Sequence, residues 1–344
     1  MRTIRFHSYG GDEVLTLEEV PDPVPGPGQI IVRVRSCAIN HLDLDFRAGV
    51  SRIPLDLPHI LGMEAAGDVV GVGAGVSRLQ PGDRVMALAD IVCHVCAYCT
   101  TGRDNMCSDA LRPGWNLPGG YAEYLCVPER GALPIPDAMD YETAAALQIA
   151  CGTAWHMLIT RAGLRVGETV VINAVGSGIG SVALQLAKYA GARVIATAGS
   201  DEKLAIASAD GADAIVNYRR TDLDDAVRDL TGGRGADLVF EHVGGDVFTK
   251  SVACLAPSGR LVVCGGHAGE LAGIDVIDLF RKEARIIGST SATQDEVRTV
   301  LALASEGVLR PPIYRVFPLE QARDAHRTVA DRSHYGKIIL NPSQ

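Results

Sequence analysis

The chain has 344 residues, 47% of them hydrophobic, which is enough for two domains of ordinary size with a large buried core. Its net charge is −9, so it lacks the basic footprint that a nucleic-acid surface needs. We expect no nucleic-acid partner, no membrane span and no secretory signal. A cytoplasmic location follows, in which the nine cysteines are thiols or metal ligands rather than disulfides.

The first third of the chain is rich in proline, glycine and β-branched residues. Gln29–Ser36 alternates as a strand does, with Arg33 and Arg35 on the face opposite the neighbouring valines. Glu64–Val76 is expected to form strands with close-packed glycines, and Arg84–Leu88 a further strand after a Pro-Gly-Asp turn. This pattern predicts an irregular antiparallel β domain.

Four cysteines follow with the spacing C-x2-C-x2-C-x7-C in one short segment. Thiolates this close in sequence fit a tetrahedral zinc site. Disulfides would need an oxidising compartment, which the expected location does not provide. We therefore predict one structural Zn²⁺ held by Cys93, Cys96, Cys99 and Cys107.

The middle of the chain alternates strands and helices over about 140 residues, which predicts a parallel, doubly wound sheet. It begins with a strand at Thr169–Asn173, a helix at Ser181–Ala190, a strand at Arg193–Thr197 and a helix at Asp201–Ser208. Further strands are expected at Ala214–Val216, Leu238–Glu241, Leu261–Cys264 and Arg285–Gly288. The tail, with a helix at Asp295–Ser305 and a strand at Lys337–Leu340, is expected to return to the first domain.

The turn after the first of these strands is rich in glycine. It reads Ala-Val-Gly-Ser-Gly-Ile-Gly, with glycines at alternate positions instead of the strict G-x-G-x-x-G spacing. Glycines let the backbone approach a pyrophosphate, and the N-terminus of the next helix supplies N–H groups and a positive dipole. In its strand–turn–helix context the turn predicts a dinucleotide cofactor bound by Gly176, Ser177, Gly178, Ile179 and Gly180.

The end of the second strand indicates which dinucleotide binds. An NAD site usually places an acid there for the ribose 2′-OH, whereas this strand ends in Thr-Ala-Gly-Ser. Ser200 and Lys203 are candidates for holding a 2′-phosphate, so we favour NADPH. Two alternatives stay open. In the first, Ser200 only caps the next helix and Lys203 is solvated. In the second, the Asp201 carboxylate restores NAD binding.

These features together resemble the medium-chain dehydrogenase/reductase superfamily, which includes zinc alcohol dehydrogenases and quinone oxidoreductases. The resemblance covers essentially the whole chain. Besides the cysteines and the glycine-rich turn, it rests on Gly62–Gly67, Pro81–Val85, Gly119–Tyr124 and Gly336–Leu340. It implies an α/β protein in which a GroES-like irregular β catalytic domain encloses a Rossmann NADP-binding domain. The catalytic domain is expected at 1–150 and 290–344 with a zinc lobe at 90–110, the Rossmann domain at 151–289, and the assembly as a homodimer or homotetramer.

The same resemblance indicates that the catalytic zinc site of alcohol dehydrogenases is altered here. Their first cysteine ligand corresponds to Asn40 and their histidine ligand to Met63. Their third ligand falls near Ile149, with Cys151 two residues away. An amide and a thioether are poor Zn²⁺ ligands, and Leu42 replaces the hydroxyl of the usual proton relay. We expect no catalytic zinc, as in the zinc-free quinone oxidoreductase branch, which uses NADPH.

Likeness to that branch implies roles for individual residues. Asn40 is the expected hydrogen-bond donor to a developing enolate, and Asp43 orients Asn40 or the cofactor. Glu64 completes the catalytic set, or is a structural residue paired with an arginine. The implied cofactor contacts are His41 at the pyrophosphate, Thr153 near the nicotinamide and Tyr218 at the ribose phosphate. Two loops, one at Val243–Gly244 and one at Cys264, Gly265 and Gly266, are expected beside the nicotinamide. Lys337 is a candidate contact for either the cofactor or the substrate. The candidate substrate contacts are Met63, Trp115 and Tyr121, and simple packing is the alternative for these three and for Tyr218.

Without a metal Lewis acid, hydride transfer needs a small-molecule acceptor that is already activated by conjugation. We therefore predict an NADPH-dependent reductase of enones, quinones or unsaturated thioesters. The alternatives are imine or carbonyl reduction, a zinc alcohol dehydrogenase rearranged around Cys151, His41 and Glu64, and a non-catalytic NADPH-binding sensor or scaffold.

Overall fold

The computed structural model describes residues 1–343, which form two compact units. The first unit comprises Met1–Ile149, Thr293–Ser305 and the chain from Ile313 onward, and the second comprises Ala150–Ala292 and Glu306–Pro312. The tail thus belongs to the first unit except for 306–312, a segment that the sequence had assigned to the catalytic domain. Across residues 1–343, no helix has both the length and the apolar character needed to cross a membrane.

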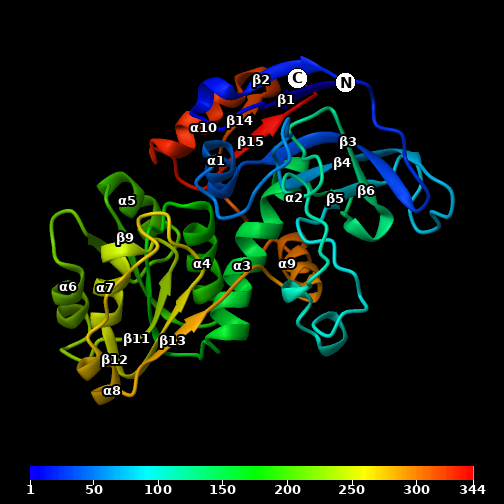
Figure 1. Cartoon of the computed structure of the whole chain (residues 1–344). Helices are drawn as coiled ribbons and strands as arrows, with labels where there is room; N and C mark the ends of the chain where they lie inside the picture. The colour runs from blue at the N-terminus through cyan, green and yellow to red at the C-terminus, as the bar shows by residue number, and fades with distance from the viewer. Residues whose placement is uncertain (344) are drawn as a thin grey trace. The chain divides into compact units, whose positions relative to one another are not determined.

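The first unit is an antiparallel β structure with a few helices. Its elements are β1 (Arg2–Arg5), β2 (Thr16–Glu19), β3 (Gln29–Ala38), α1 (His41–Ala48), β4 (Glu64–Val72), β5 (Arg84–Ala87), β6 (Tyr124–Pro128), β7 (Ala132–Pro134), α2 (Tyr141–Leu147), α9 (Gln294–Ser305), β14 (Ile313–Pro318), α10 (Ala322–Ala330) and β15 (Lys337–Asn341). The main sheet has the order β14-β15-β3-β4-β5-β7, with β6 also paired to β3. Figure 1 shows the C-terminal strand β15 in red beside β3 in blue.

Strand β3 lies in the middle of this sheet, and its side chains alternate as the sequence indicates. Val32 and Val34 are fully buried, whereas Arg33 is exposed and the half-buried Arg35 reaches Asp68 on β4 at 2.8 Å. The neighbours β4, β6 and β15 all run antiparallel to β3. Among the named strands of this unit within residues 1–343, β14 and β15 alone pair in parallel, which the sequence pattern did not reveal.

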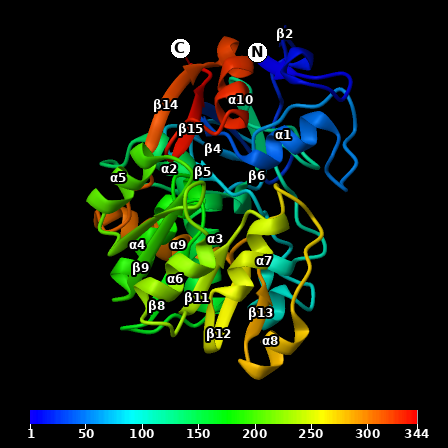
Figure 2. The same cartoon turned by 90° about the vertical axis from the view of Figure 1, so that its left-hand side faces the viewer.

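The second unit is a parallel sheet flanked by helices (Figures 1 and 2). Its elements are α3 (Thr153–Trp155), β8 (Thr169–Ile172), α4 (Gly178–Tyr189), β9 (Arg193–Ala198), α5 (Asp201–Ala209), β10 (Ala214–Asn217), α6 (Leu223–Leu230), β11 (Ala236–Glu241), α7 (Gly245–Ala253), β12 (Leu255–Val263), α8 (Val276–Arg281) and β13 (Arg285–Gly288). The strand order is β10-β9-β8-β11-β12-β13, so the order reverses direction between β8 and β11. This is the doubly wound order of dinucleotide-binding domains, and it confirms the predicted fold class.

Burial explains why this sheet forms. Val170, Val171 and Ile172 of β8 are all fully buried, as expected for a central parallel strand with helices on both faces. One face of α4 is buried against the sheet as well, at Val182, Ala183, Leu186 and Ala187.

Candidate functional site

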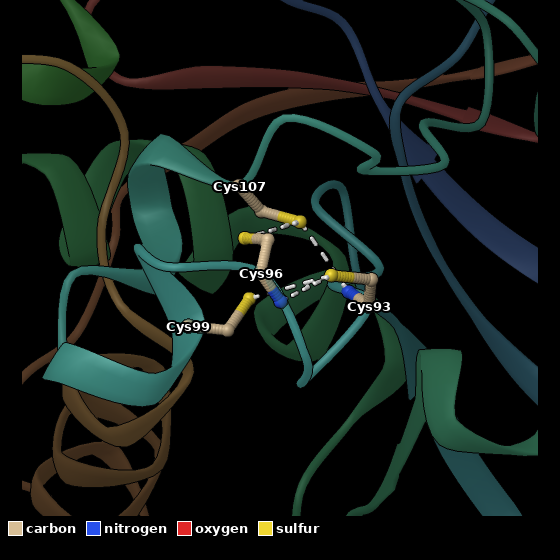
Figure 3. A group of neighbouring side chains, drawn as sticks. All are labelled: Cys93, Cys96, Cys99 and Cys107. Carbon is tan, nitrogen blue, oxygen red and sulfur yellow. Dashed lines mark hydrogen bonds between the residues drawn. The ribbon is translucent and has the colours of Figure 1, made fainter.

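The four cysteines come together in the loop between β5 and β6 (Figure 3). Their sulfur atoms all lie within 4.8 Å of one another, with 3.9 Å between Cys93 Sγ and Cys99 Sγ and 4.0 Å between Cys96 Sγ and Cys107 Sγ. A zinc ion about 2.3 Å from each sulfur would place the sulfurs about 3.8 Å apart. Backbone N–H groups of Cys99 and Ser108 lower the pKa of Cys96, which favours its thiolate, whereas burial raises the pKa of Cys99 and of Cys107. The cluster therefore fits a structural zinc.

The glycine-rich turn lies where the second unit can bind a dinucleotide, at the carboxyl end of β8 beside the reversal of strand order. Ser177 caps α4 by accepting a hydrogen bond from the Gly180 N–H at 3.0 Å. Gly180 packs so closely that a Cβ atom there would lie 2.5 Å from the carbonyl oxygen of Ala174. The helix N-terminus and the tight turn provide the backbone N–H groups that a pyrophosphate needs.

Two loops follow β11 and β12 at the same edge of this sheet. Glu241 accepts hydrogen bonds from the N–H groups of Val243 at 2.7 Å and Gly244 at 3.2 Å, which fixes the first loop. The Cys264 N–H donates to the Glu241 carbonyl oxygen at 3.2 Å, so the predicted loops at Val243 and at Cys264, Gly265 and Gly266 lie together. His242 was missed by the sequence analysis. Its Nε2 is 3.0 Å from the Asn173 carbonyl oxygen and 3.4 Å from Ser177 Oγ, and burial lowers its pKa to about 4.

At the tip of β9, the structure clarifies the roles of the residues expected to select the cofactor. The Asp201 carboxylate accepts from Asn217 at 2.6 Å and pairs with Arg220 at 2.7 Å, so it is already engaged by other side chains. Ser200 occupies the N-cap position of α5 without a side-chain capping bond. The aliphatic stem of Lys203 lies against Gly176 in the glycine-rich turn.

Arg219 is a second basic residue at this tip that the sequence analysis missed. A Cβ atom on Gly199 would lie 2.9 Å from both Arg219 Nε and the Tyr218 hydroxyl, so these side chains flank the end of β9. Both side chains are exposed. The sequence signal that could have indicated Arg219 is a basic residue two positions after β10, the third strand of this sheet in chain order.

Asn40, Glu64 and Lys337 form a polar triangle in the first unit, in which Glu64 and Lys337 are buried and Asn40 is half-buried. The Lys337 ammonium donates to Asn40 Oδ1 at 2.8 Å and to Glu64 Oε2 at 2.9 Å, and Asn40 Nδ2 donates to the same Glu64 oxygen at 3.0 Å. The other Glu64 oxygen accepts from the Ile149 N–H. Side chains of Lys337 and Glu64 are 5% and 1% exposed, so this is a buried ion pair.

Strand pairing explains how residues so far apart in sequence meet. Ala38 at the end of β3 is opposite Glu64 on β4 and also opposite Ile339 on β15. Asn40 follows β3 by two residues, and Lys337 precedes Ile339 by two residues. One of the two alternatives given for Glu64 was a structural residue paired with an arginine, and that pairing is wrong, because the cation is Lys337.

Asp43 is fully buried beneath this triangle. It accepts hydrogen bonds from the N–H groups of Asn40 at 2.7 Å and Gly62 at 3.2 Å. Burial raises its pKa to about 7, while these two donors and the Lys337 charge act in the opposite direction. Asp43 therefore orients Asn40 through the backbone, as one of the two predicted alternatives requires.

The residues proposed to contact substrate behave differently from one another. Met63 is buried, and Trp115 packs its ring on Phe46 with the centroids 5.7 Å apart. Tyr121 is completely buried, with its hydroxyl 3.0 Å from His326 Nε2. Tyr121 is thus enclosed by side chains of the first unit itself. The roles of His41 at a pyrophosphate and of Thr153 near a nicotinamide stay predictions.

Comparison with known proteins identifies both units. Residues 26–137 match the model of the alcohol dehydrogenase GroES-like domain, and residues 178–306 match that of the zinc-binding dehydrogenase family. The chain is 30% identical over 349 residues to the quinone oxidoreductase of Homo sapiens and 31% identical over 350 residues to that of Pseudomonas aeruginosa. These alignments cover 99% of this chain and 97% and 99% of those proteins. A solved NAD-dependent alcohol dehydrogenase superposes with a TM-score of 0.93 at 40% identity, covering 99% of both chains.

Proposed function

Because the chain belongs to the medium-chain dehydrogenase/reductase superfamily, we propose that it is an NADPH-dependent reductase of carbon–carbon double bonds conjugated to a carbonyl group. The substrates would be enones, quinones or unsaturated thioesters. The observation that carries this proposal is the Lys337 ammonium held between Asn40 and Glu64. The similarity to quinone oxidoreductases of two organisms is in agreement with it.

The donor set around Lys337 does not fit a catalytic zinc ion. The positions equivalent to the zinc ligands of alcohol dehydrogenases carry an amide, a thioether and an isoleucine in Asn40, Met63 and Ile149. The Glu64 carboxylate is already paired with a cation 2.9 Å away. Divalent zinc prefers thiolate and imidazole ligands, and a neighbouring ammonium would repel it. The proposed reaction therefore uses no metal ion at this site.

The chemistry proposed for this site is stabilisation of the negative charge that develops on the carbonyl oxygen. NADPH, when bound, supplies the hydride. An ammonium group has three protons, and the bonds of Lys337 to Asn40 and Glu64 use two of them, which leaves one to donate. The ammonium and the Asn40 amide are thus preorganised donors for an enolate oxygen, and water supplies the second proton. Lys337, which the sequence had assigned mainly to the cofactor, becomes part of the catalytic group.

The preference for NADPH is supported by the basic residues at the tip of β9 and by the engagement of Asp201. Replacing Arg219 by alanine is expected to raise the KM for NADPH by roughly 10- to 100-fold, since a charge-assisted hydrogen bond contributes about 1.5–3 kcal/mol. The KM for NADH should not change, because NADH has no 2′-phosphate. Steady-state kinetics with both cofactors will measure this. Arg228→Ala, on exposed helix α6, is the matched control. Equal effects of Arg219→Ala on both cofactors would contradict a 2′-phosphate role.

The proposed reaction is tested by following NADPH oxidation with 1,4-benzoquinone, 2-cyclohexenone and crotonyl-CoA, and NADP⁺ reduction with primary and secondary alcohols. We expect turnover with at least one conjugated acceptor and none with the alcohols. Alcohol oxidation would instead favour the activity named for the solved NAD-dependent relative. Tight NADPH binding without turnover on the whole panel would favour the sensor or scaffold.

A further inference from the structure

A series of four polar side chains, three of them buried and Arg47 half-buried, leads away from the site and takes no part in the chemistry proposed above. It runs from Arg47 on α1 to His326 on α10, then to Tyr121 and Asp43. Arg47 Nη1 is 3.1 Å from His326 Nδ1, and His326 Nε2 is 3.0 Å from the Tyr121 hydroxyl. The Asp43 carboxylate is close enough to the Tyr121 hydroxyl that, after burial, its charge and hydrogen bonding raise the pKa of Tyr121 well above its usual value. His326, Tyr121 and Asp43 are each completely buried, and all four residues belong to the first unit.

The chemistry of these groups fixes the direction of every hydrogen bond. A guanidinium can only donate, so His326 Nδ1 must accept from Arg47. Burial, and then the Arg47 charge, lower the pKa of His326 to about 3, so the ring is neutral and carries its single proton on Nε2. Nε2–H therefore donates to the Tyr121 oxygen, which leaves the Tyr121 O–H to donate to Asp43. All three bonds point toward the Asp43 carboxylate.

Asp43 is the point where this series meets the site. One of its oxygens accepts from the Asn40 N–H and the other from the Gly62 N–H. These backbone groups belong to the two segments that present Asn40 and Glu64 to Lys337. Gly62 has φ +103°, and a Cβ atom there would lie 2.6 Å from the Tyr121 ring, so the ring is pressed against this segment. Three donors to one carboxylate stabilise its ionised form, in which it holds both segments.

We propose that Tyr121 and His326 are positioning residues, which act through Asp43 to hold the Asn40 amide in the geometry that meets the Lys337 ammonium. This inference rests on the proposed function, because it gives the polar triangle its catalytic purpose. It explains why a fully polar chain is retained in the core, where an unpaired polar group would cost stability. It also ties helix α10, near the C-terminal end of the chain, to a site formed largely by the N-terminal third.

The first experiment reads the hydrogen-bond direction without any turnover. In protein labelled with ¹⁵N-histidine, the His326 signals are assigned by comparison with His326→Gln. We expect a neutral ring with the proton on Nε2 at neutral pH, and no protonation at mildly acidic pH. The opposite tautomer, or a charged ring at neutral pH, would overturn the proposal even if the enzyme is active. Because this readout needs no substrate, it stays valid if the proposed reaction fails.

The second experiment separates positioning from packing. Tyr121→Phe removes only the hydroxyl, and we expect kcat to fall by about 10- to 100-fold with an unchanged KM for NADPH, because misplaced groups lose rate rather than binding. His326→Leu should cause a similar loss and add little to Tyr121→Phe, since both break one series. His326→Gln should retain most of the activity, because its amide can accept from Arg47 and donate to Tyr121. Tyr314→Phe, an exposed tyrosine on β14, is the control.

The pH profile gives a third readout, for which the charges around Asp43 are Lys337, Glu64 and the neighbouring Cys37 and Tyr121. Protonation of Asp43 weakens the hydrogen bonds by which it holds the Asn40 and Gly62 N–H groups. Activity should therefore fall as the pH drops through the pKa of Asp43. Losing the Tyr121 donor should move this acid limb to higher pH by about one unit. Full kcat with an unmoved acid limb in Tyr121→Phe, or additive losses in the double variant, would show that these residues only pack.

Discussion

Replacing Lys337 by methionine is expected to lower kcat/KM for a conjugated acceptor by about 10²–10³-fold, the usual effect of removing one preorganised donor to an oxyanion. The same change should destabilise the protein by about 3–5 kcal/mol, because it leaves the buried Glu64 carboxylate without its cation. Urea unfolding followed by circular dichroism measures the second effect, and NADPH-coupled kinetics the first.

The double variant Glu64→Gln/Lys337→Met separates these effects. It removes both charges, so most of the lost stability should return, while kcat/KM should stay low. Lys337→Arg keeps the charge and should retain more activity than Lys337→Met, although the planar guanidinium cannot reproduce both hydrogen bonds. If the double variant were stable and fully active, Lys337 would have no role in the chemistry, and the proposed function would lose its main support.

Elemental analysis is expected to find one zinc ion per chain, held by the four cysteines. Cys107→Ser should abolish this zinc, because removing one thiolate leaves too few ligands for a closed tetrahedral site. The apolar cluster around the cysteines is small and includes Val92 and Ala110, so the lobe should lose its structure without the metal. Faster tryptic cleavage after Arg103, inside the lobe, measures this change.

The control for the zinc experiment is Cys126→Ser, which alters a cysteine on β6 outside the cluster and should keep the metal. Two zinc ions per chain would contradict our interpretation of Asn40 and Met63, and alcohol oxidation would then become the favoured activity. An unchanged zinc content in Cys107→Ser would show that the metal is bound elsewhere.

Local sequence was sufficient wherever neighbours in the chain decide the structure. The alternation in Gln29–Ser36 gave the central strand β3, and the glycine-rich turn gave the capped N-terminus of α4. The cysteine spacing indicated a zinc site because all four ligands lie within fifteen residues of one another. The fold class and the family could be predicted for the same reason, because the motifs that indicate them each span only a few residues.

Tertiary structure decided what depends on pairing between distant segments. From the sequence, Glu64 was placed in the catalytic set, and the one partner considered for it was an unspecified arginine. The register of β15, β3 and β4 brings Lys337 to it across 273 positions of the chain. His326 and Tyr121 are 205 positions apart, and neither carries a local signal that links it to Asp43. Hydrophobic periodicity and turn residues determine which elements form, but hydrogen bonds between buried side chains depend on how the elements pack. The sequence therefore determined the family and the metal site, whereas only the folded structure decided which cation meets Glu64 and what holds Asn40 in place.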